Sequence, residues 1–115
     1  MSENSPNRLS TEEIKQAASV SVEEGVDIRV KVRDLTLRAL KTRKLSAEEI
    51  RPVINAITEG ISVGAAKRAG EVKSALSEGV AGMDEALTKA AEATRLALEQ
   101  LTSQARDFSE SELDW

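Results

Sequence analysis

The apolar residues between positions 53 and 108 form a stripe that returns at helical spacing almost without interruption. At 100° per residue they fall within one half of the helical circumference, and the opposite half is mostly polar. A finer spacing of eleven residues keeps such a stripe on one side of a nearly straight helix. The pattern predicts a long amphipathic helix built on Ile54, Ile57, Ile61, Ala65, Ala69, Val72, Leu76, Val80, Met83, Leu87, Ala90, Ala97, Leu101, Ala105 and Phe108.

The preceding segment, residues 11–43, also divides into a polar arc and an apolar arc on a helical wheel. Residues 26–33 alternate strictly between apolar and charged side chains, which is equally the pattern of a half-buried strand. Only Gly25 marks a turn beside them. We therefore expect a helix throughout residues 11–43, with a strand over residues 26–33 as the alternative.

Two segments carry the same signal for the start of a helix. Residues 9–14 read LSTEEI and residues 45–50 read LSAEEI. In each, a serine followed three residues later by glutamate forms a capping box, and the flanking apolar residues form a hydrophobic staple. The repetition indicates a weak internal duplication, with two copies of one helix-starting unit.

The ends of the chain differ from its middle. Residues 1–8 are expected to be a disordered leader, and residues 9–107 a single helical domain. A third start signal, FSESEL at residues 108–113, has almost no chain after it. Residues 108–115 are therefore expected to be either an acidic tail or the start of a truncated further helix.

Glycines interrupt the second predicted helix. At about 1 kcal/mol each relative to alanine, Gly60, Gly64, Gly70, Gly79 and Gly82 cost roughly 5 kcal/mol of helix propensity. Close approach of another helix is the natural compensation for those on or beside the stripe. Gly79 and Gly82 are equally compatible with a turn.

The predicted fold is all-α, with two long antiparallel amphipathic helices. The second is expected to be kinked or broken near residues 79–82, and a three-helix bundle is the alternative. An unbroken helix over residues 53–107 would be about 80 Å long. The first helix covers only half of that length, so we expect the second half of the stripe to meet another molecule.

Composition removes most catalytic chemistry. The chain has no Cys and no His, which excludes thiol nucleophiles, imidazole acid–base groups and Cys or His metal sites. Adjacent glutamates such as Glu48 and Glu49 point 100° apart on a helix and do not converge. No catalytic, metal or cofactor residue is predicted, and neither is a small-molecule substrate. We expect a non-enzymatic, soluble, cytoplasmic protein.

The one marked charge cluster is basic and lies within residues 29–44. It indicates an anion-binding patch, although cations also favour the end of a helix and acidic residues follow closely in the sequence. The chain as a whole has a net charge of -4 and no aromatic residues among these cations, so we expect no nucleic acid partner. The patch comprises Arg29, Lys31, Arg33, Arg38, Lys41, Arg43 and Lys44.

The Ala-, Thr- and Ser-rich repeat from Ala65 to Gln104 resembles phasin-like bacterial proteins in composition and periodicity. Those proteins are elongated helical oligomers that coat storage granules. The resemblance implies that the stripe covers an apolar surface, although the glycine content and the paired capping boxes depart from that pattern. It implies no particular functional residue.

The pattern favours a structural or adaptor protein that acts through helix–helix association, as a homo-oligomer or with a partner helix. The alternatives are a phasin-like coat on a membrane, granule or lipid body, and a regulator that binds an anionic ligand at residues 29–44. The predicted partner interface consists of Val80, Met83, Leu87, Leu98, Leu101, Phe108 and Trp115.

Overall fold

The computed structural model describes residues 9–44 and 46–113, with side chains as far as Gln100 apart from Leu98. Within these ranges the chain forms four helices and no strand, which confirms the all-α prediction. They are α1 (Thr11–Glu24), α2 (Ile28–Lys41), α3 (Ala47–Ala66) and α4 (Val72–Leu113).

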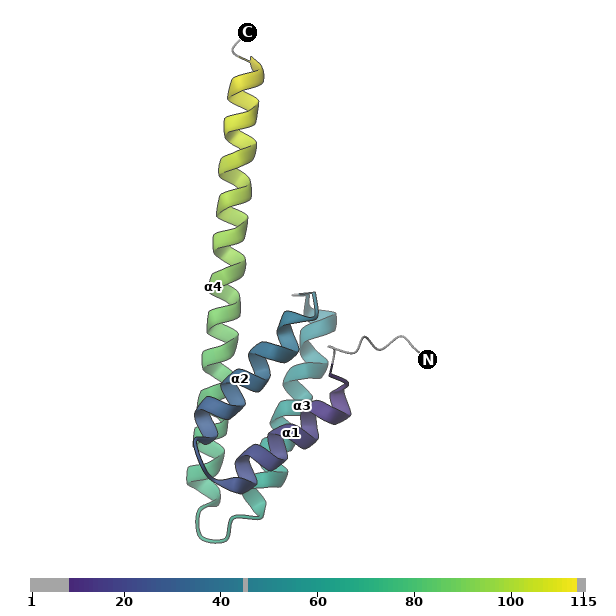
Figure 1. The fold of residues 1–115 in the computed structure, drawn as a ribbon, viewed down its shortest axis with the longest axis vertical. Coiled ribbons are helices and arrows are strands. Elements are labelled where there is room, and N and C mark those ends of the chain that lie inside the picture. The colour runs from purple at the N-terminus through teal and green to yellow at the C-terminus, as the bar shows by residue number, and fades with distance from the viewer. Residues whose placement is uncertain (1–8, 45, 114–115) are drawn as a thin grey trace.

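The helices form two hairpins that lie on one another (Figure 1). The first hairpin is α1 with α2, and the second is α3 with α4. α1 runs alongside α3 in the same direction, since Lys15 pairs with Glu59 at 4.0 Å and Glu23 pairs with Lys67 at 3.7 Å. α2 lies along α4 in the same way. Each hairpin begins at one of the two repeated start signals.

The first predicted long helix is two helices, so that prediction was wrong. Gly25 adopts the left-handed conformation with φ 76°, and its N–H donates to the carbonyl of Val22 at 3.1 Å. Asp27 follows with φ 53°, and α2 then begins at Ile28. The strand alternative was also wrong, because residues 28–33 belong to α2. Glycine readily ends a helix in this way because it has no Cβ to oppose a positive φ.

The second predicted helix is also divided, but not where the glycine pair indicated. α3 ends at Ala66, and the turn to α4 contains Gly70 with φ 81°. Through Gly79 and Gly82 the helix α4 is continuous, so a kink or turn at residues 79–82 was a wrong prediction. The three-helix alternative, which needs the same turn, was wrong for the same reason.

Three of the helical glycines lie where two backbones approach closely. A Cβ on Gly60 would meet the Lys15 carbonyl oxygen and would lie 2.6 Å from the Ala18 Cβ. A Cβ on Gly64 would meet the Ser19 carbonyl oxygen, and one on Gly82 would meet that of Arg29. The predicted compensation by close helix packing is confirmed at these positions.

The core lies between the two hairpins and consists mainly of alanine and β-branched residues, together with Leu35 and Leu40. Thr36 is buried with them, and its hydroxyl donates to the Val32 carbonyl at 2.7 Å. The capping box at Ser10 forms as predicted, whereas the Ser46 side chain makes no capping hydrogen bond. The largest fully buried side chains are those of Ile14, Val22, Val32, Thr36, Val53, Ile57 and Ile61.

α4 is far longer than the helices that pack on it. At 1.5 Å per residue its 42 residues span about 63 Å, against about 30 Å for the 20 residues of α3. The molecule measures 71 × 35 × 20 Å, and the C-terminal part of α4 projects alone from the bundle (Figure 1). Its radius of gyration, 18.4 Å, exceeds the roughly 13 Å of a compact domain of this length.

The break after α1 gives a test of the first hairpin. Gly25→Ala should lower the free energy of unfolding by about 1–2 kcal/mol, because alanine opposes the left-handed conformation. Gly25→Asn should cost less, since asparagine tolerates positive φ better. Urea denaturation followed by circular dichroism measures both. Equal stability of the alanine variant and the parent would contradict the left-handed cap.

Candidate functional site

Two apolar grooves lie where α4 leaves the bundle. The first, between α2 and α4, has a volume of about 690 Å³ and is lined by Leu37, Leu40, Ala90 and Ala93 together with charged residues. The second, of about 410 Å³, lies among the end of α2, the start of α3 and α4. Because Leu40 and Ala90 line both, the grooves flank α4 at one level. The second is lined by Leu40, Ile50, Leu87, Ala90, Ala91, Thr94 and Arg95.

The residues predicted for the partner interface have different environments in the structure. Met83 and Leu87 are half-buried and pack against the core, and the Thr58 hydroxyl lies 3.7 Å from the Met83 sulfur. Val80 is exposed. Of these three only Leu87 lines a groove. The side chains of Leu98, Leu101 and Phe108, and the whole of Trp115, lie outside the described residues.

Beyond Arg95, α4 has no cover from the rest of the described chain. Thr94 and Arg95 are the last α4 residues that line a groove, and the next side chain, Leu96, is 54% exposed. The backbone nevertheless remains helical to Leu113, with no other helix beside it (Figure 1). We call residues 96–113 the projecting segment.

The first half of the predicted anion patch is occupied by carboxylates from its own chain. Arg29 and Arg33 both pair with Glu85 on α4, the latter with its Nη1 3.7 Å from Glu85 Oε1. Lys31 pairs with Glu24 at 3.0 Å. These residues hold α2 to α4 and to the end of α1, which gives them a structural role.

The second half of the patch borders the grooves. Arg38 and Lys41 line the α2/α4 groove together with Lys89, and Arg95 lines the other groove. We call these four residues the rim cations. None of them forms an ion pair within the part of the chain that the structure describes. Asp34, the one carboxylate lining the α2/α4 groove, lies 3.2 Å from the Nε of Arg33.

The other members of the predicted patch do not join the rim. Arg43 donates to the carbonyls of Ala39 and Leu9, at 3.0 and 2.6 Å, and so ties the end of α2 to the start of α1. Lys44 is exposed in the α2–α3 connection. Sequence reasoning missed Lys89 and Arg95 because they lie on a different helix, far along the chain from the basic cluster.

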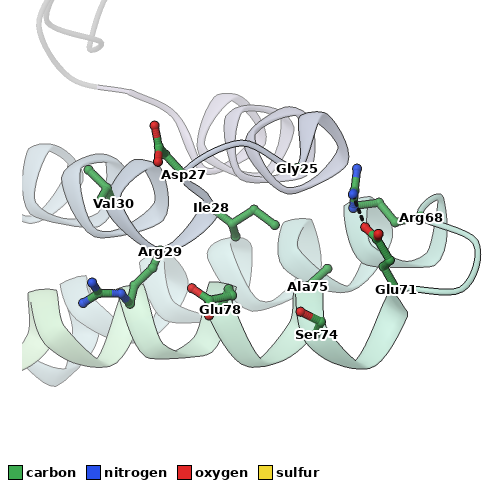
Figure 2. Close-up of a pocket in the computed structure, with 10 residues that line it drawn as sticks. All are labelled: Gly25, Asp27, Ile28, Arg29, Val30, Arg68, Glu71, Ser74, Ala75 and Glu78. Carbon is green, nitrogen blue, oxygen red and sulfur yellow. Dashed lines mark hydrogen bonds and ion pairs between the residues drawn. The ribbon is translucent and has the colours of Figure 1, made fainter.

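A further cleft of about 410 Å³ lies at the opposite end of the bundle, beside the α1–α2 turn (Figure 2). Arg68 points toward the end of α1, where its Nη1 donates to the Glu23 carbonyl at 3.1 Å, and it also pairs with Glu71. The guanidinium thus joins the α3–α4 turn to the α1–α2 turn. Because Arg68 and Glu71 serve these contacts, they have a structural role in the cleft.

Among the side chains that the structure describes, which end at Gln100, no group of three or more acidic residues is placed to hold a metal ion. Within residues 9–44 and 46–113 no helix combines the length and the apolar character needed to cross a membrane. The described surface feature that stands out is therefore the pair of apolar grooves with their rim cations, at the base of the projecting segment.

Comparison with known proteins gives one match. A family model, described as that of a family of unknown function (DUF6781), matches residues 4–115. No curated protein and no solved structure matches the chain.

Proposed function

The chain belongs to the family of unknown function DUF6781, and we propose that it is a non-enzymatic association module that binds another helix through the projecting segment of α4. The observation that carries this proposal is the uncovered length of α4. From Leu96 to Leu113 the helix extends about 27 Å past the grooves without a neighbour in the described chain.

A helix in that position needs a partner. Helices of this length are marginal in water, and in proteins most of their stability comes from packing an apolar face. The apolar stripe of the sequence continues along the projecting segment, at Leu98, Leu101, Ala105 and Phe108. By helical periodicity these positions continue the line of Met83, Leu87 and Ala90, which face the core inside the bundle.

The spacing of the stripe favours a helix as the partner. From Leu87 onward, positions on and beside the stripe include a series that alternates in steps of four and three residues, the spacing of a coiled-coil seam. Such a seam is narrower than the wide apolar face of helices that lie on lipid. The seam runs through Leu87, Ala91, Thr94, Leu98, Leu101, Ala105 and Phe108.

The test removes the stripe from the full-length protein. The triple variant Leu98→Ser, Leu101→Ser, Phe108→Ser should have the 12.4 kDa mass of one chain, whereas the parent should be larger. Light scattering after size-exclusion chromatography measures the mass, and circular dichroism checks that the bundle stays folded. The control is Leu96→Ser, which removes an exposed leucine from the same helix and should change nothing.

A parent protein that stays at 12.4 kDa while α4 is helical to its end would contradict the proposal. In that case the projecting segment would need no partner. A stripe variant with the same mass as an associated parent would contradict it too, because association would then use another surface.

A further inference from the structure

We infer that the α2/α4 groove is a docking site for an acidic amphipathic helix of another protein, which places apolar side chains on the floor of the groove and pairs its carboxylates with the rim cations there. This surface is separate from the apolar stripe of the projecting segment, so the inference does not depend on the proposed function. It rests on the charge of the groove, on the position of its cations and on the helix face that forms its floor.

The groove is basic although the chain as a whole is acidic. Its lining has four cations and one carboxylate, whereas the chain has a net charge of -4. The carboxylate of Asp34 is already paired, 3.2 Å from the Nε of Arg33. Three of the cations, Arg38, Lys41 and Lys89, form no ion pair with the described residues, and the fourth donates to backbone carbonyls. Unpaired positive charge in one groove of an acidic protein favours a partner of negative charge.

The unpaired cations belong to both walls of the groove. Arg38 and Lys41 lie on α2, and Lys89 lies on α4. The apolar part of the lining also comes from both helices, with two leucines on α2 and two alanines on α4. A ligand with a single carboxylate would pair with one wall only. An amphipathic helix with carboxylates along both edges of its apolar stripe would pair with both walls.

The α4 wall is a face of small residues that already packs against a helix. An added Cβ on Gly82 would meet the Arg29 carbonyl oxygen of α2, so the two helices approach closely there. Ala90 and Ala93 lie on the same face, about two and three turns further along α4. Ala90 is half-buried and Ala93 is exposed. Small side chains at these positions allow another helix to approach α4 closely.

The size of the groove indicates what the bound helix contributes. Its volume of about 690 Å³ has room for several apolar side chains. The lining spans about one turn of each helix, from Leu37 to Lys41 on α2 and from Lys89 to Ala93 on α4. The bound helix therefore contributes large apolar residues three or four positions apart, with carboxylates on either side of them.

Binding of a synthetic helix to the full-length protein tests the inference by fluorescence anisotropy. The labelled probe has leucine at the first and fourth positions of each heptad and glutamate at the flanking positions. One control peptide has the same composition in a scrambled order that is not amphipathic, and another has lysine in place of glutamate. The parent protein should bind the acidic helix at least about 10-fold more tightly than either control peptide.

Removing one cation from each wall tests the charge of the groove. The double variant Arg38→Gln, Lys89→Gln should weaken binding of the acidic helix by about 3- to 10-fold, because two ion pairs with the helix are lost. The matched control, Arg51→Gln, Lys73→Gln, removes one arginine and one lysine from exposed positions outside the groove. It should bind the acidic helix as the parent does.

Filling the groove tests its shape without a change of charge. Ala93→Phe places a large side chain on the α4 wall and should weaken binding by about 10-fold, because the ring occupies the space of the bound helix. Ala93 is exposed, and circular dichroism checks that the variant stays folded. The matched control is Ala91→Phe, at an exposed position that lines the smaller groove, and it should change nothing.

Several outcomes would overturn the inference. Equal binding of the acidic and scrambled peptides would show that the groove does not select a helix. Binding that Ala91→Phe weakens and Ala93→Phe does not would place the helix on the apolar stripe. Self-association that is lost in the double variant would mean that a second copy occupies the groove. Phosphatidylglycerol vesicles or a DNA duplex that bind at the groove cations in place of the acidic helix would identify a different anion.

The stripe variant separates this inference from the proposed function. It should bind the acidic helix as tightly as the parent does, whether or not it has lost self-association. A stripe variant that no longer binds the acidic helix would overturn the inference, because binding would then use the projecting segment.

Discussion

The double variant Gly60→Ala, Gly64→Ala is expected to lose about 2–5 kcal/mol of unfolding free energy, although alanine is the better helix former. Propensity alone predicts the opposite sign, a gain of about 1 kcal/mol at each position. The packing decides, because each added methyl would meet a backbone carbonyl of α1, at Lys15 and at Ser19. A loss of this size is comparable to the whole stability of a small domain.

Backbone contact is the reason that the protein cannot easily relax around these methyls. α1 and α3 would have to separate along their shared length, and the core packing of Ile14, Ala18 and Val22 would loosen with them. Gly79→Ala is the matched control. Its Cβ would lie 2.7 Å from the Cγ2 atom of Ile61, a buried side chain rather than the backbone of a neighbouring helix, so we expect a smaller loss than for the double variant.

Urea denaturation followed by circular dichroism gives the three unfolding free energies. At a concentration where light scattering finds a single chain, these values report the fold alone. A double variant as stable as the parent, or more stable, would mean that α1 and α3 do not approach as closely as Gly60 and Gly64 allow.

The sequence predicted the helical class and the close packing of glycines, but it missed the break after Glu24 and placed the other break at residues 79–82 instead of after Ala66. In a sequence, a glycine that ends a helix cannot be distinguished from a glycine that allows a neighbouring helix to approach closely. Gly25 is of the first kind, with φ 76°, and Gly70, with φ 81°, lies in the turn between α3 and α4. Gly79 and Gly82, in the middle of α4, are of the second kind. The difference lies in what packs against each position, and a single sequence does not contain that information.

Periodicity also concealed the α1–α2 break. Residues 11–43 keep one apolar side across it, because both helices of the hairpin turn their apolar faces to the same core. Most of the alternating stretch lies within α2, where Ile28 and Val32 are buried and Val30 is exposed, so the alternation arises from an apolar residue on the solvent side of a helix. Apolar residues that keep helical spacing along a segment therefore indicate that the segment packs on one core. They do not show that the segment is one continuous helix.

The candidate surface was predictable in part. The stripe indicated that some of the long C-terminal helix lacks a neighbour within the chain, and Leu96, 54% exposed, lies where that part begins. The rim was not predictable, since Arg38 and Lys41 meet Lys89 and Arg95 only after α2 has packed along α4. The spacing of the basic residues also could not distinguish Arg29, which pairs with Glu85, from Arg38, which forms no ion pair with the described residues.

Leu87→Asp is expected to lower the unfolding free energy by about 2–4 kcal/mol, because it places a carboxylate where a half-buried leucine packs against the core. Leu96→Asp makes the same change nine residues along the same helix, at an exposed position, and should stay within about 0.5 kcal/mol of the parent. Urea denaturation at a concentration that keeps both variants monomeric measures the two values.

The contrast between these two leucines locates the boundary between the bundle and the projecting segment. If Leu87→Asp were as stable as Leu96→Asp, Leu87 would not pack against the core. The part of α4 without a neighbour would then begin at Leu87, and Leu87 would not line the groove with Leu40 and Ile50. If Leu96→Asp were as damaging as Leu87→Asp in the monomer, the bundle would extend past Arg95. The expected step between them would leave residues 96–113 without a partner in the described chain, which is the premise of the proposed association with another helix.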